Sequence, residues 1–316
     1  MKIFRFTLLS VVLSCSCTLF YSCTEDSSLD EIGKPVPDNW GAQDPRYEEL
    51  TETLTSLTHK TVLNSGNFNP ETGASYLKQI RKWLYVINAD AQGGLLEGDV
   101  VASVVTSCMA AQSVASLSHN PEGPELMSLE RSLDQQLLAD TSWVKTPLDN
   151  AGYIHNIVLV NLYKNYGEEL LTIPTSQIYS ETNYLVTKYL GASFVNPEAE
   201  RNAEQLHEQM LEVYNSSETI NDFYVEWKAL NPNLRNQLNI LEIVMHGFSQ
   251  IDLNADNGRY LNAVMQTINA SALSQNEKQS LRTGISIGHA SAILWSRQFF
   301  SSKHVEAANI VDNALE

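Results

Sequence analysis

Apolar residues recur at spacings of three and four along most of this chain. Ile80, Trp83 and Ile87 share one side of a helix in this way, and comparable patterns continue as far as Ile293. No segment combines sustained alternation of apolar and polar residues with flanking turn residues, which is the pattern of a half-buried strand. The sequence therefore predicts an all-α protein, a multi-helix bundle or array of about eight to ten helices with few or no strands.

Local signals place the ends of several helices. Ser274 and Glu277 form the Ser-x-x-Glu pattern of a capping box at the start of the last helix. Small and apolar residues fill 100–117 without a polar face, so we expect this helix to be buried on all sides. The expected helical ranges are 72–91, which should be amphipathic, then 100–117, 126–138, 154–163, 175–190, 197–214, 234–248, 260–268 and 274–299.

The N-terminal segment has the parts of a secretory signal. Lys2 and Arg5 give it a positive start, and the apolar run 6–21 is short for a helix that spans a bilayer. Ser22 is the small residue that a signal peptidase requires before its cut, and Cys23 follows it. This arrangement resembles a bacterial lipoprotein signal, in which several acyl chains on the cysteine give a stable membrane anchor.

Cys23 is favoured over two other cysteines as the lipidated residue. A cut at Cys15 or Cys17 would leave apolar residues at the mature start, whereas acidic residues follow Cys23. An uncleaved membrane anchor is the alternative, but no charge cluster that stops transfer follows the apolar run. Ser-Cys before acidic residues resembles lipoproteins of Bacteroidetes-type bacteria. We therefore expect a lipid-anchored protein of the cell envelope, attached to either the periplasmic or the cell-surface face of the outer membrane.

Three segments are expected along the chain. Residues 1–22 are the signal peptide, 23–45 are the lipidated cysteine and a flexible acidic tether, and 46–316 are a single helical domain. The whole chain has a formal charge of −17, from 20 basic and 37 acidic residues. A field of this sign repels nucleic acid and anionic lipid headgroups, so the expected membrane contact is the anchor at Cys23 and no nucleic-acid partner is expected.

The sequence offers no convincing metal or cofactor motif. None of the seven histidines lies three or four residues from another, and His-Glu-x-x-His does not occur. Asp252, Asn254 and Asp256 alternate like the first ligands of a calcium loop, but the glycine and the final glutamate of such a loop are not at their positions, which favours a turn between helices. Cys108 lies in apolar helical surroundings and is predicted to be a buried, unreactive thiol.

Three short motifs follow the order found in serine β-lactamases and penicillin-binding proteins. They are Ser-Tyr-Leu-Lys at 75–78, Tyr-Lys-Asn at 163–165 and Arg-Thr-Gly at 282–284. In those enzymes the third motif lies on a strand, whereas here it falls within the predicted helix 274–299. No strand-rich half is predicted that would hold an oxyanion hole. We therefore assign no catalytic residue from these motifs.

The most distinctive polar string is Gly-Tyr-Ile-His-Asn at 152–156, in an otherwise apolar helix. Gly152 permits a close backbone approach, and His155 and Asn156 are expected to cap or cross-link neighbouring helices, with a ligand or metal role as the alternative. Asp90 is expected to accept a hydrogen bond from His155, which would raise the pKa of the ring. Asp90, His155 and Asn156 are the candidate polar site. Small residues that would admit the Gly152 helix are Ala89, Gly93, Gly94, Gly98 and Ala102.

Three stretches of the chain together carry a resemblance. Their residues are Trp83, Asp90, Gly94 and Gly98 in the first, 152–156 in the second, and Ser271, Leu273, Lys278, Leu281, Ile285, Ser291 and Trp295 in the third. This order resembles a loosely defined group of uncharacterised helical lipoproteins or secreted proteins of Bacteroidetes-type bacteria, which carry Gly-x-x-His-Asn and a terminal Ser-x-x-x-Trp helix. No activity is attached to the group, so the resemblance implies a fold and a location. The middle segment of the group is rich in glycine and alanine, whereas 100–117 here is richer in valine and serine.

The sequence favours a non-enzymatic binding or assembly protein of the cell envelope. Its expected partner is a protein, a peptide or a glycan. Candidate contact residues are the aromatic side chains Tyr179, Tyr184, Tyr189 and Trp227. The alternative is an extracytoplasmic hydrolase that acts on the cell wall or on polymers, with either His155 or the pair Ser75 and Lys78 at its centre.

Overall fold

The computed structural model describes residues 44–64, 85–95, 100–116, 147–191, 198–217, 219–251, 253–256 and 258–299. Within these ranges every regular element is a helix and no strand occurs, which confirms the all-α prediction. The chain divides into two compact units, Met1–Ala42 and Gln43–Glu316, and all of the described residues belong to the second. Cys23 and the predicted signal peptide lie outside the described residues.

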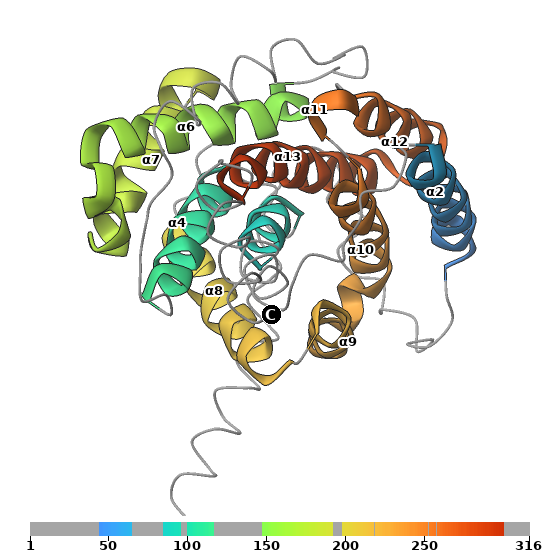
Figure 1. Cartoon of the computed structure of the whole chain (residues 1–316), viewed down its shortest axis with the longest axis horizontal. Coiled ribbons are helices and arrows are strands. Elements are labelled where there is room, and N and C mark those ends of the chain that lie inside the picture. Colours follow the sequence, from blue (N-terminus) through green and yellow to red (C-terminus); the bar gives the residue numbers. More distant parts are fainter. Residues whose placement is uncertain are drawn as a thin grey trace, which may run out of the picture. The chain divides into compact units, whose positions relative to one another are not determined.

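Figure 1 shows the helices in chain order. They are α2 (Pro45–Asn64), α4 (Val100–Ser116), α6 (Ala151–Tyr166), α7 (Thr175–Leu190), α8 (Ala199–Ser216), α9 (Ile220–Leu230), α10 (Arg235–Gln250), α11 (Leu253–Asp256), α12 (Arg259–Ala270) and α13 (Gln275–Phe299). Residues 85–95 form a further helical segment. Short 3-10 helices are η1 (Pro147–Asn150), η2 (Gly167–Leu171) and η4 (Pro232–Leu234).

Most of the predicted helices are present. Seven expected ranges correspond to α4, α6, α7, α8, α10, α12 and α13, with ends that agree within three residues. The capping box also forms, because the Ser274 amide donates to Glu277 Oε2 at 2.7 Å and the Glu277 amide donates to Ser274 Oγ at 3.3 Å. The expected helix 126–138 lies outside the described residues.

Three of the described α-helices were not expected from the sequence, namely α2, α9 and the single-turn α11, and one expectation was wrong. The helix α2 has a narrow apolar side and many threonines, and α9 begins at a Thr-x-x-Asp capping box formed by Thr219 and Asp222. The segment 72–91 was expected to be amphipathic, but its described part, 85–91, is buried on every side and continues as a helix to residue 95. Its polar residues are therefore core residues.

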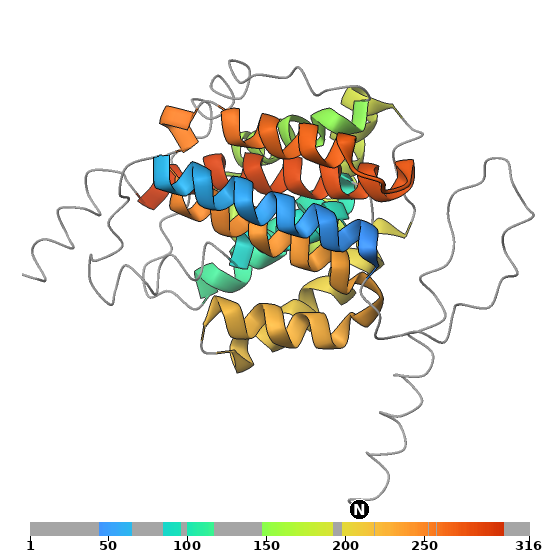
Figure 2. The same ribbon diagram turned by 90° about the vertical axis from the view of Figure 1, so that its right-hand side faces the viewer.

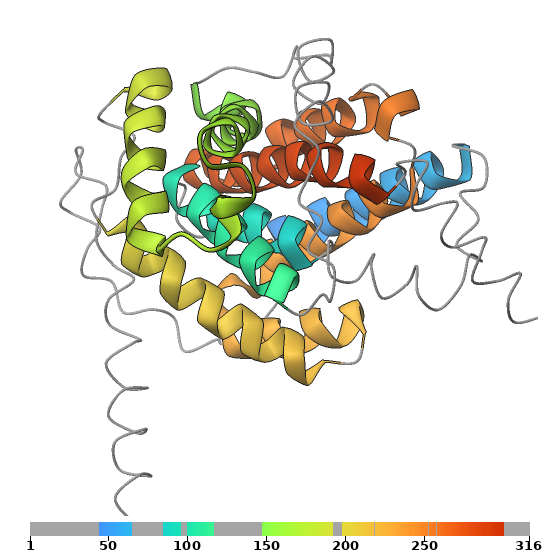
Figure 3. The ribbon, with the colours of Figure 1, turned by 60° about the vertical axis from the view of Figure 1, so that its left-hand side comes forward.

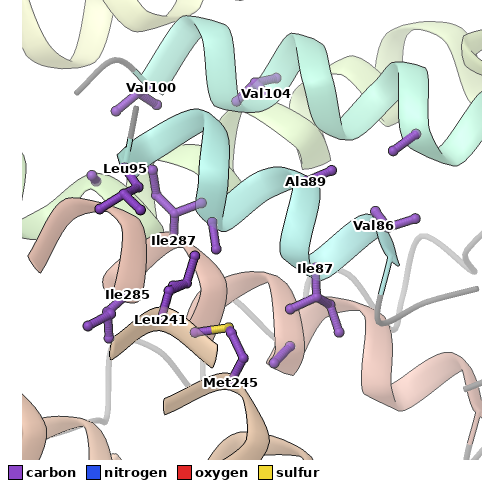
Figure 4. Packing of buried hydrophobic residues seen from close by; sticks show 14 of the residues in the cluster. Val86, Ile87, Ala89, Leu95, Val100, Val104, Leu241, Met245, Ile285 and Ile287 are labelled. Carbon is purple, nitrogen blue, oxygen red and sulfur yellow. The ribbon is translucent and has the colours of Figure 1, made fainter. Parts of the chain in front are cut away.

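Several long helices pack around α13. This helix contacts α6, α10 and α12, and it also contacts η1. In Figure 2, α2 lies alongside α10 and α12, with which it makes its main contacts. In Figure 3, α4 lies against α8, and α7 packs beside α4 and α6. The helices thus enclose a continuous apolar core, to which 85–95 contributes side chains such as Val86, Ile87 and Leu95 (Figure 4).

Glycines allow the central helices to approach closely. A Cβ on Gly284 would lie 2.8 Å from the carbonyl oxygen of Ala91, and a Cβ on Gly152 would overlap the carbonyl group of Ser286. The helix that contains Gly152 was expected to pack against the small residues of 85–95. Its close approach is instead to α13, and Gly93 and Gly94 face α4 and α13, respectively. Gly98 lies outside the described residues.

Candidate functional site

The segment 85–95 carries three polar side chains, all of them at most 1% exposed: Asn88, Asp90 and Gln92. Asn88 and Gln92 are four residues apart and share one side of the helix. On this side Tyr224 Oη donates to Asn88 Oδ1, and Trp227 Nε1 donates to Gln92 Oε1, both from α9. A buried amide oxygen without a hydrogen-bond partner is costly. These two bonds therefore attach α9 to the segment 85–95, which is called the central segment below.

Asp90 faces other helices. Its Oδ2 accepts a hydrogen bond from Ser291 Oγ on α13, and its backbone oxygen accepts one from Ser103 Oγ on α4 at 2.7 Å. The Nε2 atom of His155, on α6, lies 3.7 Å from the same Oδ2 atom. Asp90 therefore joins its own helix to α4, α6 and α13 at one buried point.

Asn156 holds the ring of His155 in place. Asn156 Oδ1 is 3.0 Å from His155 Nδ1, and Asn156 Nδ2 donates to the carbonyl oxygen of Ala290 at 2.8 Å. The amide therefore bridges α6 and α13, which agrees with the cross-linking role expected from the sequence. Asp90, His155 and Asn156 are all 0% exposed. The structure thus brings the three candidate residues together, within the core.

One expectation about this group is wrong. At 3.7 Å, His155 Nε2 and Asp90 Oδ2 are too far apart for a direct hydrogen bond. The pKa of His155 is not raised; burial lowers it to about 4, because the charged ring would lose its hydration. The hydrogen bond to Asn156 raises the pKa, but by less than burial lowers it. The imidazole is therefore neutral at neutral pH.

Burial and, as the smaller cause, the Asp90 carboxylate both disfavour ionisation of the Cys108 thiol. The thiol is 3% exposed and unpaired, and burial raises its pKa, with Asp90 as a second cause. The thiol form is therefore strongly favoured, and a thiol without thiolate character is a poor nucleophile. This agrees with the prediction of an unreactive cysteine.

The residues of the hydrolase motifs do not form a described site. Ser75 and Lys78 lie outside the described residues. The Arg-Thr-Gly motif at 282–284 lies within α13, as expected, and Arg282 Nε is 3.0 Å from Asp149 Oδ1. Both side chains are at most 7% exposed, so the guanidinium binds a carboxylate of its own chain. Its role here is to attach η1 to α13.

The region expected to be a turn rather than a calcium loop contains a helix cap. Asp256 Oδ2 accepts a hydrogen bond from the Tyr260 amide at 2.9 Å, at the start of α12. Gly258 precedes this helix with φ of 75°, a conformation that glycine adopts without strain. The Asp252 position is outside the described residues. In the described ranges, no group of three or more His, Cys, Asp and Glu side chains is placed to hold a metal ion.

The candidate contact residues differ in exposure. Tyr184 is 65% exposed and Tyr189 is 37% exposed, both on α7, whereas Tyr179 is half-buried. The expectation for Trp227 is wrong, because its ring is 0% exposed and stacks parallel to Phe223 with 6.3 Å between ring centroids. Other exposed apolar side chains are Leu63, Val225 and Leu230. Among the described helices, none is long and apolar enough to cross a membrane.

Asp90, His155 and Asn156 were predicted from the sequence, but the residues that surround them were not. Asn88, Gln92 and Ser103 were missed, and Ser291 was noted only for its place in the terminal helix. A usable signal was present, since polar residues at 88, 90 and 92 cannot all lie on one solvent face of a helix. Comparison of the chain with protein-family models, with curated proteins and with solved structures gave no match in any of the three.

Proposed function

We propose that this chain is a cell-envelope lipoprotein that acts as a non-enzymatic binding or assembly protein. The observation that carries this proposal is the burial of its candidate polar site, since Asp90, His155 and Asn156 are all 0% exposed. A general base or nucleophile must come within hydrogen-bond reach of its substrate. The buried residues instead bind one another and neighbouring helices, as structural polar groups do.

The alternative, an extracytoplasmic hydrolase, receives less support. His155 has no exposed surface, and Arg282, the residue that would bind a substrate carboxylate, is paired with Asp149. Ser75 and Lys78, outside the described residues, are the remaining centre for such an enzyme. This alternative therefore makes a separate prediction, in which activity depends on Ser75 and not on the buried cluster.

The anchor and the location rest on the N-terminal sequence. Lipidation at Cys23 would hold the acidic tether and the helical unit at the outer membrane, where the net charge of −17 would keep the protein body away from anionic headgroups. Cells grown with an alkyne-tagged fatty acid should label the wild-type protein and not Cys23→Ala. Label that persists in Cys23→Ala would contradict the assignment, and Cys15 and Cys17 would be the next residues to replace.

The binding function is tested with the mature protein, residues 24–316. The immobilised protein is exposed to lysate and culture medium of its own organism, and bound metal is measured in the same sample. We expect a specific protein, peptide or glycan partner and no stoichiometric metal. Tyr184→Ala is a first probe of the contact surface, and Val225→Ala is its matched control, since both side chains are 65% exposed.

The same preparation is assayed for hydrolysis of isolated cell walls and soluble polysaccharides. Turnover that is lost in Ser75→Ala would overturn the binding proposal in favour of the hydrolase. Stoichiometric zinc or iron lost with His155→Gln would also count against it, because it would make the buried cluster a chemical site. No turnover and a reproducible partner would support the binding protein.

A further inference from the structure

The helix α7 buries one side and exposes the other. Ile178, Thr182 and Val186 recur at intervals of four residues and are each 0% exposed. This buried side packs within the array, where α7 contacts α4, α6 and α8. The opposite side is exposed and is called the α7 outer face. Its residues are Gln177, Ser180, Tyr184, Thr187 and Lys188.

The α7 outer face carries almost no charge. The whole helix has one acidic residue, Glu181, and one basic residue, Lys188. The next helix, α8, has four glutamates and one arginine, and the whole chain has a formal charge of −17. An uncharged surface has little electrostatic attraction for a cationic partner, and the field of an acidic protein repels an anionic one. The α7 outer face is therefore best matched to an uncharged partner.

An aromatic ring lies at the centre of this face. Tyr184 is 65% exposed, so most of its side chain reaches solvent. Tyr189 lies beside the face, is 37% exposed and has Lys188 Nζ 5.5 Å from its ring centroid. The ammonium group covers one side of the Tyr189 ring through a cation–π contact. Tyr184 is therefore the more accessible ring for a partner to stack on.

The residues around Tyr184 form hydrogen bonds and add little apolar surface. Ser180 lies one helical turn before Tyr184 and Lys188 one turn after it, on the same side of the helix. Gln177 is placed by its own amide, because its Nε2 donates to Tyr166 Oη at 3.3 Å. Among the described residues, the large aliphatic side chains that are exposed lie on α2 and α9. The α7 outer face thus lacks the apolar core of a typical protein interface.

The size of the face points in the same direction. From Gln177 to Lys188 it is about 16 Å long, and one helix is about 10 Å wide. A standard protein–protein interface covers about 800 Å² on each partner, which is several times this area. A short chain of sugar rings, by contrast, fits along a single helix.

We propose that the α7 outer face binds a neutral oligosaccharide, with the ring of Tyr184 as its stacking platform. This inference rests on the proposed binding function and names the class of its partner. One face of a sugar ring presents C–H groups, which pack against an aromatic face. The hydroxyl groups at its edge both donate and accept hydrogen bonds, as do the side chains of Ser180, Thr187 and Gln177.

An array of neutral glycans, followed by isothermal titration of the mature protein, residues 24–316, tests the proposal. We expect a neutral oligosaccharide to bind, with an affinity that changes less than about twofold between about 50 and 500 mM NaCl, because salt screens only charged contacts. Oligogalacturonate, an acidic oligosaccharide, should not bind, since the charge of −17 repels it.

Variants of Tyr184 locate the site. Tyr184→Ala should weaken binding by about tenfold or more, as expected for an aromatic anchor. Tyr184→Phe keeps the stacking ring and should bind within about threefold of the wild type. Val225→Ala is the matched control on α9, where an equally exposed side chain should not affect sugar binding. Far-ultraviolet circular dichroism checks that each variant is folded.

Two results would overturn the proposal: no neutral glycan binds, or binding is unchanged in Tyr184→Ala. A protein partner whose capture depends on Tyr184, without any sugar binding, would also overturn it, but the proposed binding function would stand. Sugar binding that depends on Tyr184 would support the α7 outer face as the site. Cleavage of the bound oligosaccharide would instead contradict the non-enzymatic function, so the two proposals fail in different ways.

Discussion

Replacing Trp227 by phenylalanine should destabilise the fold without touching a binding surface. The ring is fully buried, and its Nε1 atom donates to Gln92 Oε1 on the central segment. Trp227→Phe keeps an aromatic ring beside Phe223 but removes this donor and leaves a small cavity. The unsatisfied amide oxygen should cost about 1–3 kcal/mol, and the lost ring atoms about 1–2 kcal/mol more.

The combined loss of about 2–5 kcal/mol in the free energy of unfolding is large against a total stability of about 5–15 kcal/mol. Urea denaturation followed by far-ultraviolet circular dichroism measures it, and the melting temperature should fall by roughly 2–4 °C for each kcal/mol. The surface variant Tyr184→Ala should change stability by less than about 0.5 kcal/mol, because its side chain is 65% exposed.

A double-mutant cycle separates the hydrogen bond from the packing. Gln92→Leu removes the acceptor, so in the background of Gln92→Leu the Trp227→Phe substitution should cost about 1 kcal/mol less than it costs in the wild type. Two single effects that add within about 0.5 kcal/mol would show that the Trp227–Gln92 contact does not couple α9 to the central segment. The account of α9 as fastened by buried amides would then be wrong.

Further predictions concern buried groups and a close helix contact. The pKa of His207 and of His289 is lowered by burial to about 4, so the unfolded chain binds extra protons between about pH 6.5 and 4 and stability falls as the pH falls through this window. In urea denaturation, His289→Leu should reduce this slope by up to about 1.4 kcal/mol per pH unit, and an unchanged slope would contradict the burial argument. Gly152→Ala should lower the free energy of unfolding by about 3 kcal/mol or more, because its Cβ would meet the backbone of α13. Gly191→Ala, at a positive φ in open space, should lower it by about 1 kcal/mol. Equal losses in thermal melts would argue against the close contact. Cys108 should stay unmodified by a thiol reagent in the folded protein and react once urea is added, and rapid labelling without urea would disprove its burial.

The positions of most helices follow from local sequence. The capping box of Ser274, the proline before α7 and the spacing of apolar residues act within a few residues, so a single sequence is enough to read them. The buried state of α4 also follows, because a helix with no polar face has nowhere to expose one. The helix α2 was missed because its apolar side is narrow, and its burial against α10 and α12 compensates for the weak pattern.

The helical class, the position of most helices and the presence of unusual polar residues at 90, 155 and 156 can be read from the chain alone. The contacts of those residues depend on how the helices pack in the folded protein. Asp90 meets Ser291 across 201 positions, and Gln92 meets Trp227 across 135, so the partners depend on which helices pack together. That choice is made by shape at the glycines of 85–95, α6 and α13, where missing side chains let backbones touch. The same packing of helices buries His155 and Asn156, which suggested a site in the sequence, in the core.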